Sequence, residues 1–405
     1  MVFRKEKKKN EAEPSEKQVD LVQVLRQQKR TQRRNRRIVG LIAVVALLIY
    51  LSGAFSAAVS IGKTWYESIG ISFATQSGYP AQTGISNIYQ VELLSGGFVV
   101  LGEESCLVYS TGGNRLRSIQ SGYLRPTIAA GSTSYLLYQR AGNELRVESR
   151  TQTLYTKTYS NSILLASIAD SGSVAVVTES DRYLASLTVY SATMQEKLSY
   201  SMTDSEGIPL RMEYSPDSKT LAIATISASG GQMYAQLCLI SPSAGTVTWV
   251  DAQNATPLAI EWVSKTQVMV IYDNIAILYD TETAQQLASY SYPNKTLADY
   301  AVYQDSVVLL FTQSAQSEAV LLQIDADFTQ ETTISTQAAA SSIALDQDRI
   351  YLIYEKEIES YTVTGEFLDC YESSKKILEL LVADDLFLFT ADTVELFIPP
   401  SIPQL

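Results

Sequence analysis

A short pattern recurs eight times along this chain: a few apolar residues, a tight polar or glycine turn, and then a second apolar run. One copy is YSPDSKTLAIAT at residues 214–225, and another is IADSGSVAVVTE at residues 168–179. The second runs begin at Phe98, Tyr135, Val174, Leu221, Val268, Val307, Ile350 and Leu386. Their spacings of 36 to 47 residues are typical of β-propeller blades, in which each repeat forms four strands.

The remainder of each unit also fits a four-stranded antiparallel sheet. A third apolar segment follows the second, as in SCLVYS (105–110), and a more polar fourth segment usually comes next. Strands that are almost purely apolar are expected where sheets pack on both faces. We therefore predict an all-β fold, a β-propeller of eight four-stranded blades. Seven blades, with one irregular unit, is the alternative.

The last unit ends in ELFIPPSIPQL, where prolines stop strand pairing before a fourth strand can form. Closing the ring then requires a strand from the N-terminal side, and IGISFAT (69–75) is a candidate. The predicted organisation is a linker with this candidate strand at 61–80, the propeller at 81–398 and a C-terminal tail at 399–405.

Residues 38–60, IVGLIAVVALLIYLSGAFSAAVS, contain no charged residue. A run of about 20 apolar residues spans a bilayer as a helix, so the sequence predicts a single transmembrane helix. Arg33, Arg34, Arg36 and Arg37 precede it directly, and this basic flank places the N-terminus in the cytoplasm and the propeller outside. A cleavable signal peptide is the competing interpretation.

Charge divides the chain sharply at the same point. Residues 1–37 hold 13 Lys and Arg against 5 Asp and Glu, whereas the rest holds 18 against 38, a net charge of −20. The first segment has few apolar residues and is predicted to be a largely disordered cytoplasmic tail. The acidic remainder argues against nucleic acid as a partner.

The turn in YSPDSKTLAIAT is predicted to be structural. Its turn residues are Ser215, Pro216 and Asp217; Pro216 presets φ, and Asp217 can bond nearby backbone amides. The turn resembles that between the first two strands of WD40-like and TolB-like blades, where Ser-Pro-Asp-Gly-Lys is common, although Ser218 here replaces the glycine. The whole arrangement of basic tail, membrane span and degenerate propeller resembles an uncharacterised bacterial family, domain of unknown function family 5711. That resemblance implies a fold and a location and no activity.

Catalytic and cofactor motifs are missing from the sequence. There is no histidine, so Ser-His-Asp catalysis and His-bound metals are excluded, and no nucleotide-binding loop occurs. DADF (325–328) and DQDR (346–349) pair carboxylates without a calcium loop, and adjacent acids such as Asp384 and Asp385 point to opposite faces of a strand. We predict no catalytic residue, no cofactor and no metal site.

Three cysteines and 25 tyrosines complete the candidates. Cys106, Cys238 and Cys370 have no CxxC spacing and are expected to be small buried strand residues. Most tyrosines lie in predicted strands, where packing explains them.

The predicted function is that of a membrane-anchored, extracytoplasmic binding or scaffolding module rather than an enzyme. Its predicted partner at the cell envelope is a protein or a cell-wall glycan. The alternative is an envelope sensor that relays ligand binding to the tail. A carboxylate-based hydrolase is the third hypothesis.

Overall fold

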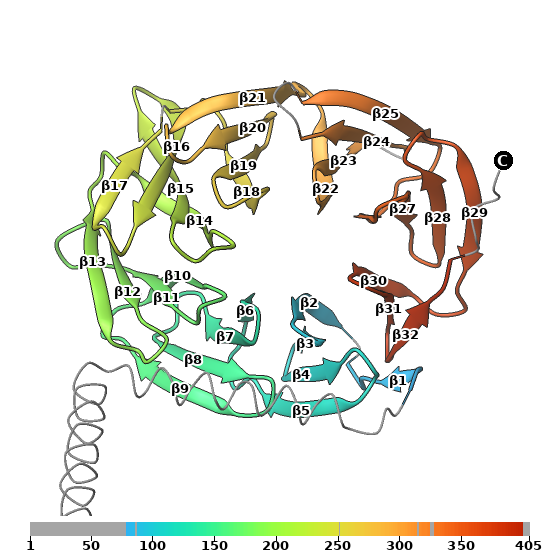
Figure 1. The fold of residues 1–405 in the computed structure, drawn as a ribbon, viewed down its shortest axis with the longest axis horizontal. Helices are drawn as coiled ribbons and strands as arrows, with labels where there is room; N and C mark the ends of the chain where they lie inside the picture. Colours follow the sequence, from blue (N-terminus) through green and yellow to red (C-terminus); the bar gives the residue numbers. More distant parts are fainter. Residues whose placement is uncertain (1–77, 86, 251, 314–315, 325–327, 400–405) are drawn as a thin grey trace, which may run out of the picture. The chain divides into compact units, whose positions relative to one another are not determined.

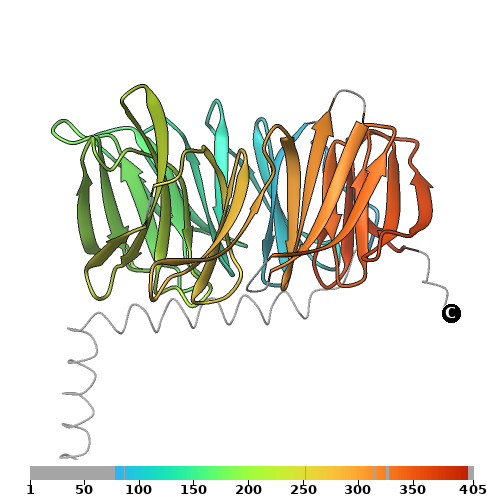
Figure 2. The ribbon, with the colours of Figure 1, turned by 90° about the horizontal axis from the view of Figure 1, so that it is seen from above.

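The computed structural model describes residues 78–85, 87–250, 252–313, 316–324 and 328–399. Within these ranges the chain forms 32 strands and no helix. The strands make eight four-stranded antiparallel sheets, which stand side by side in a ring (Figures 1 and 2). We call the axis that the first strands surround the central channel; a hollow at one end of it has lining residues as far apart in the ring as Glu92 and Tyr303. The prediction of an eight-bladed β-propeller is confirmed, and the seven-bladed alternative is wrong.

The N-terminal part of the chain lies outside this description. The predicted basic tail (1–37), the membrane span (38–60) and most of the linker belong to residues 1–77. In the ranges that are described, no helix has the length and apolar character that a bilayer crossing requires.

In every blade the first strand lies nearest the channel, and we number the blades 1 to 8 from β2 onward (Figure 1). The first strands are β2 (Ile88–Leu94), β6 (Pro126–Ala130), β10 (Ile163–Ile168), β14 (Ile208–Tyr214), β18 (Pro257–Trp262), β22 (Thr296–Tyr303), β26 (Ser342–Leu345) and β30 (Ile377–Val382). The second strands are β3 (Gly97–Gly102), β7 (Ser134–Gln139), β11 (Val174–Thr178), β15 (Leu221–Ser229), β19 (Gln267–Tyr272), β23 (Ser306–Gln313), β27 (Arg349–Ile353) and β31 (Leu386–Thr390). Each of the eight apolar runs predicted from the sequence is one of these second strands.

The third and fourth strands complete the blades toward the rim. The third strands are β4 (Ser105–Ser110), β8 (Glu144–Ser149), β12 (Ala185–Tyr190), β16 (Gln232–Ser241), β20 (Ile275–Asp280), β24 (Gln316–Gln323), β28 (Glu357–Thr362) and β32 (Thr393–Phe397). The outermost strands are β5 (Arg115–Gln120), β9 (Thr153–Thr158), β13 (Glu196–Met202), β17 (Thr246–Trp249), β21 (Gln285–Ser291), β25 (Thr329–Thr336), β29 (Phe367–Glu372) and β1 (Ala81–Gln82).

The ring closes in blade 8, whose outermost strand comes from the other end of the propeller. Ala81 pairs with Val394 and Gln82 with Thr393, and the Tyr109 hydroxyl of blade 1 donates a hydrogen bond to the Gln82 carbonyl oxygen at 2.8 Å. Closure from the N-terminal side therefore agrees with the prediction. The strand that closes the described ring is β1, whereas the candidate strand at 69–75 lies outside the described residues.

Apolar side chains pack between neighbouring blades. In β3, Phe98 and Val100 belong to the cluster shared with blade 8, while Val99 and Leu101 belong to the cluster shared with blade 2. Alternate residues of a strand point to opposite faces, so a strand with a blade on either side must be apolar throughout. Among the described residues there is one such cluster for each of the eight junctions.

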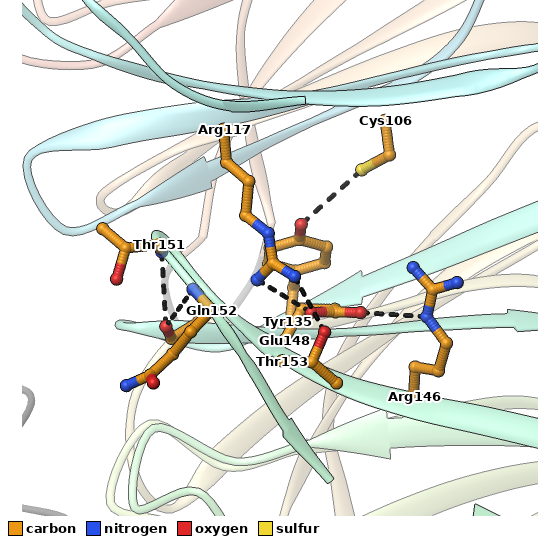
Figure 3. Close-up of polar contacts among 9 residues, drawn as sticks. Cys106, Arg117, Tyr135, Arg146, Glu148, Thr151, Gln152 and Thr153 are labelled. Atoms are coloured by element: carbon orange, nitrogen blue, oxygen red, sulfur yellow. Dashed lines mark hydrogen bonds and ion pairs between the residues drawn. The ribbon is translucent and has the colours of Figure 1, made fainter. Parts of the chain in front are cut away.

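Blades 1 and 2 are also joined by buried charges (Figure 3). Glu148 on β8 is fully buried, and its Oε1 accepts a hydrogen bond from Arg146 Nε at 2.9 Å. Its Oε2 lies 2.9 Å from Arg117 Nη1 of blade 1 in an ion pair that lacks hydrogen-bond alignment. Arg117 also donates from Nη2 to Thr153 Oγ1 at 2.8 Å. The carboxylate therefore links a rim strand of blade 1 to blade 2.

The cysteines and tyrosines follow the layering of the blades. Cys106 and Cys238 are free and buried, as predicted, but Cys370 is exposed. The prediction fails for Cys370 because it lies on β29, an outermost strand with no further strand covering it. Tyr135, Tyr138 and Tyr351 are buried in the core, in agreement with the packing interpretation. Tyr354, which was also expected inside a strand, follows the end of β27 and is half-buried.

Candidate binding surface at the central channel

Acidic side chains stand on the first strands around the channel. They are Glu92 on β2, Glu213 on β14, Glu261 on β18, Asp299 on β22 and Glu379 on β30. The charge of Glu92 acts on Glu213, Glu261 and Glu379, although blades 1 and 5 lie on opposite sides of the ring (Figure 1). These acids therefore lie on strands around the channel, close enough for their charges to interact.

Hydrogen bonds hold several of these acids in place. The Tyr300 hydroxyl donates to Glu261 Oε1 at 2.6 Å, and the Ile343 backbone amide donates to Asp299 Oδ2 at 3.0 Å. Gln90 Nε2 donates to Glu92 Oε1 at 2.9 Å. Such contacts orient the carboxyl groups and tie blades 5, 6 and 7 together at the channel wall.

Burial and mutual repulsion favour the protonated forms of these acids. Burial, followed by the charges of Glu261, Glu92 and Asp170, raises the pKa of Glu213 to about 8. Burial, followed by the charge of Asp299, raises the pKa of Glu379 to about 7. Many protein atoms surround Glu213, but its side chain is exposed to solvent in the channel. Water therefore screens its charge, and the raised pKa of Glu213 has a reduced effect on stability. The channel consequently gains negative charge as the pH rises through neutrality.

Replacing Glu379 by glutamine is expected to stabilise the protein at pH 8 by about 1–3 kcal/mol. Between its ordinary pKa and about 7, the folded state keeps a proton that the unfolded state releases, so wild-type stability falls as the pH rises through this range. At pH 4 both states are largely protonated and the gain should vanish. Urea denaturation at the two pH values measures this difference, and Glu372→Gln on the exposed face of β29 controls for the loss of a charge. Equal gains at both pH values would contradict the explanation.

The channel opens on the face that carries the turns between first and second strands. We call it the inner-turn face; its turns are residues 95–96, 131–133, 169–173, 215–220, 263–266, 304–305, 346–348 and 383–385. Hollows of 760 and 620 Å³ on this face share Tyr303 and residues 383–385. A third hollow, of 250 Å³, shares Ala130 and Asp170 with the largest. Together they draw lining residues from all eight blades, and we call them the channel mouth.

The lining of the channel mouth is mixed in character. It includes the acids Asp170, Asp384 and Asp385 together with Leu93, which is 41% exposed, and Tyr303. The prediction that Asp384 and Asp385 lie on a strand is wrong, because both belong to the turn between β30 and β31 and line the same two hollows. A surface of this kind can receive cationic and apolar side chains at once.

The predicted turn residues Ser215, Pro216 and Asp217 lie between β14 and β15. Ser215 Oγ donates to Asp217 Oδ1 at 2.8 Å and accepts from the Thr220 amide at 3.0 Å. Ser218 adopts a φ of 62°, the left-handed conformation for which glycine is common. Ser215 and Pro216 also line the 250 Å³ hollow. The four arginines predicted to flank a membrane lie outside the described residues.

The two acid pairs considered as calcium ligands have different outcomes in the structure. Residues 325–327 lie outside the described ranges, and Asp346 is engaged in its own turn. Its Oδ1 accepts from the Asp348 and Arg349 amides at 2.9 and 2.8 Å, and its Oδ2 accepts from the Tyr351 hydroxyl at 2.7 Å. Within the described ranges, no group of three or more Cys, Asp or Glu side chains is placed to hold a metal ion.

Sequence reasoning missed the channel acids. Each is a single acid within or beside an apolar run, as in IPLRMEY (208–214) and PLAIEW (257–262), where it looks like an ordinary strand residue. The signal available in the sequence was that an acidic residue recurs in the first apolar segment of several units.

The closed ring, its channel and its hollowed mouth define the described chain as an eight-bladed β-propeller protein. More particularly, the chain belongs to DUF5711, a family of unknown function, whose model matches residues 71–396. None of the curated proteins matches the sequence.

Solved structures share the fold. BamB from Moraxella catarrhalis aligns with a TM-score of 0.53 and 13% identity, covering 80% of this chain and 99% of that one. The computationally designed Ika8 protein aligns with a TM-score of 0.56 and 12% identity, over 78% and 98%. Hsv2 from Kluyveromyces lactis aligns with a TM-score of 0.50 and 8% identity, over 71% and 99%. At these identities the likeness concerns the fold alone.

Proposed function

We propose that the propeller is a non-enzymatic binding module that scaffolds a protein partner at the cell envelope. The sequence supports the location, because an apolar run with a basic flank precedes the propeller at residues 38–60. The fold supports a binding role, since propellers present loops around a central opening on a rigid ring. Fold alone does not define function, so the proposal depends on the surface.

The continuous channel mouth is the observation that carries this proposal. Its hollows draw lining residues from all eight blades, whereas small-molecule sites are usually enclosed and bury most of their ligand. Asp384 and Asp385 are exposed and stand beside exposed Leu93 and half-buried Tyr303. We therefore expect a protein segment that presents lysine or arginine side chains together with apolar ones.

Charge reversal at the mouth tests the binding role. Full-length tagged protein is cross-linked in cells and recovered from solubilised membranes as wild type, as Asp384→Lys/Asp385→Lys, and as Glu366→Lys/Glu372→Lys. The last variant makes the same charge change at exposed rim positions. We expect wild type and the rim variant to recover the same protein and the mouth variant to recover at least about tenfold less of it. Equal recovery by all three would overturn the proposal, as would a captured ligand that resists protease, because it would be a glycan.

The exposed thiol of Cys370 tests on which side of the membrane the propeller lies. Cys106 and Cys238 are buried, so a membrane-impermeant maleimide should label Cys370 in intact cells if the propeller lies outside. Partial burial and the charge of Glu357 raise the pKa of Cys370, so labelling is best done at about pH 8. A Cys370→Ser variant should remain unlabelled, and Ser15→Cys in that background should react only after the cells are lysed. Labelling of Cys370 only after lysis would refute an external propeller.

A further inference from the structure

A separate hollow of 480 Å³ opens on the inner-turn face at the junction of blades 3 and 4. Blade 3 contributes Tyr190 and Lys197 to its lining, and blade 4 contributes Tyr214, Ser218 and Lys219. Tyr214 also lines the 250 Å³ hollow of the channel mouth, but none of the lining residues belongs to its two larger hollows. We call it the seam pocket.

The charge of the seam pocket is opposite to that of its surroundings. Lys197 and Lys219 are the charged residues of its lining, which contains no Asp or Glu, although residues 38–405 carry a net charge of −20. Lys219 Nζ lies 3.0 Å from Asp217 Oδ2, but its side chain is 76% exposed and keeps further donors. Lys197 is exposed as well. Two lysines from neighbouring blades thus line one hollow.

Tyr214 provides an independent observation. Its ring packs in the apolar cluster of blades 3 and 4, the residue is 5% exposed, and its buried hydroxyl has no hydrogen-bond partner. A buried polar group without a partner is unfavourable and unusual in native proteins. Tyr214 lines the seam pocket, but its hydroxyl oxygen is itself buried from solvent, so a ligand atom accepts from this hydroxyl only after a small movement of the surrounding side chains.

We propose that the seam pocket binds the phosphate group of a phosphate ester. Lysine ammonium groups and the hydroxyls of Tyr214 and Ser218 all donate hydrogen bonds, and several donors on opposite walls suit an anion with several acceptor oxygens. Charge-assisted hydrogen bonds of this kind are stronger than neutral ones. The Tyr190 and Tyr214 rings supply apolar surface for the carbon atoms of the ester.

Titration of the full-length, detergent-solubilised protein with glycerol phosphate tests the proposal, followed by calorimetry or by the ³¹P resonance. The variants are Lys197→Met, which keeps most of the stem and removes the charge, and Tyr214→Phe, which removes only the hydroxyl. Lys265→Met is the control for the loss of an exposed lysine charge, because Lys265 is exposed in the turn of blade 5 that is equivalent to the turn of blade 4 carrying Lys219. We expect saturable binding to wild type and to Lys265→Met, weakened about tenfold by Lys197→Met and severalfold by Tyr214→Phe.

Tyr214→Phe separates binding from folding. Its hydroxyl makes no hydrogen bond in the structure, so the variant should fold and melt at or above the wild-type temperature while binding the ester less well. Unchanged affinity in both seam variants would overturn the proposal, as would equal weakening by Lys265→Met. Inorganic phosphate and vesicles containing phosphatidylglycerol, tested in parallel, identify the source: tighter binding of the free ion, or binding only to vesicles, would overturn the assignment to a soluble ester.

Discussion

Replacing Glu148 by alanine is expected to lower the free energy of unfolding by about 3–5 kcal/mol, the usual effect of removing one partner from a buried ion pair. Glu148 is fully buried, and the side chains of Arg117 and Arg146 are only 16% and 18% exposed. Without the carboxylate, two guanidinium groups stay charged at the junction of blades 1 and 2, where little water can solvate them. Urea denaturation followed by far-UV circular dichroism measures the loss.

A matched control and a rescue sharpen this test. Glu104 is exposed in the turn between β3 and β4, so Glu104→Ala should change stability by less than about 0.5 kcal/mol. Replacing Arg117, Arg146 and Glu148 together by leucine removes all the buried charge and should recover part of the loss. If Glu148→Ala were as mild as Glu104→Ala, the ion pairs would not hold these blades together.

Phe389→Ala should produce a loss of similar size, about 3–5 kcal/mol. Phe389 is fully buried at the junction of blades 8 and 1, with its ring centroid 5.3 Å from that of Phe98 in an edge-on arrangement. Phe387 lies 5.1 Å from Phe98 in the same cluster. Truncating Phe389 leaves a cavity at the junction where blade 8 closes the propeller against blade 1, and it removes the edge-on contact with Phe98.

The comparison for this prediction is Phe367→Ala. Phe367 lies on the outermost strand β29 and is 57% exposed, so its truncation should cost less than about 1 kcal/mol. The same denaturation measurement applies to both variants. Equal losses would mean that the aromatic cluster does not stabilise the closure of the ring.

Much of the fold could be predicted from the sequence because the second strands are buried on both sides. Such strands must be apolar throughout, so β3 (GFVVLG) and β31 (LFLFT) are legible as uninterrupted runs. Counting them gives the number of blades. Strand β1, which closes the described ring, was not predicted, because it is two residues long and too short to show any periodicity.

The polar features were less predictable because their partners are distant in sequence. Arg117 and Glu148 lie on different blades, as do Tyr300 and Glu261, and only the ring brings each pair together. Likewise, Lys197 and Tyr214 form one pocket because blades 3 and 4 are neighbours. A single sequence shows such residues as isolated charges or aromatics. Asp217 was found because its partners lie within a few residues of it.

The pairing of β1 with β32 has a consequence for the order of folding during synthesis. Blades 1 to 7 are each built from consecutive strands, so each can form soon after its own residues are made. Ala81 must wait for Val394, which is made about 300 residues later, and contacts of such long sequence separation form slowly. Throughout synthesis, therefore, blade 1 lacks its neighbour on one side, and the apolar face that includes Phe98 stays uncovered until nearly the whole propeller has been translated. In the cell, this interval is when the chain most needs protection from aggregation.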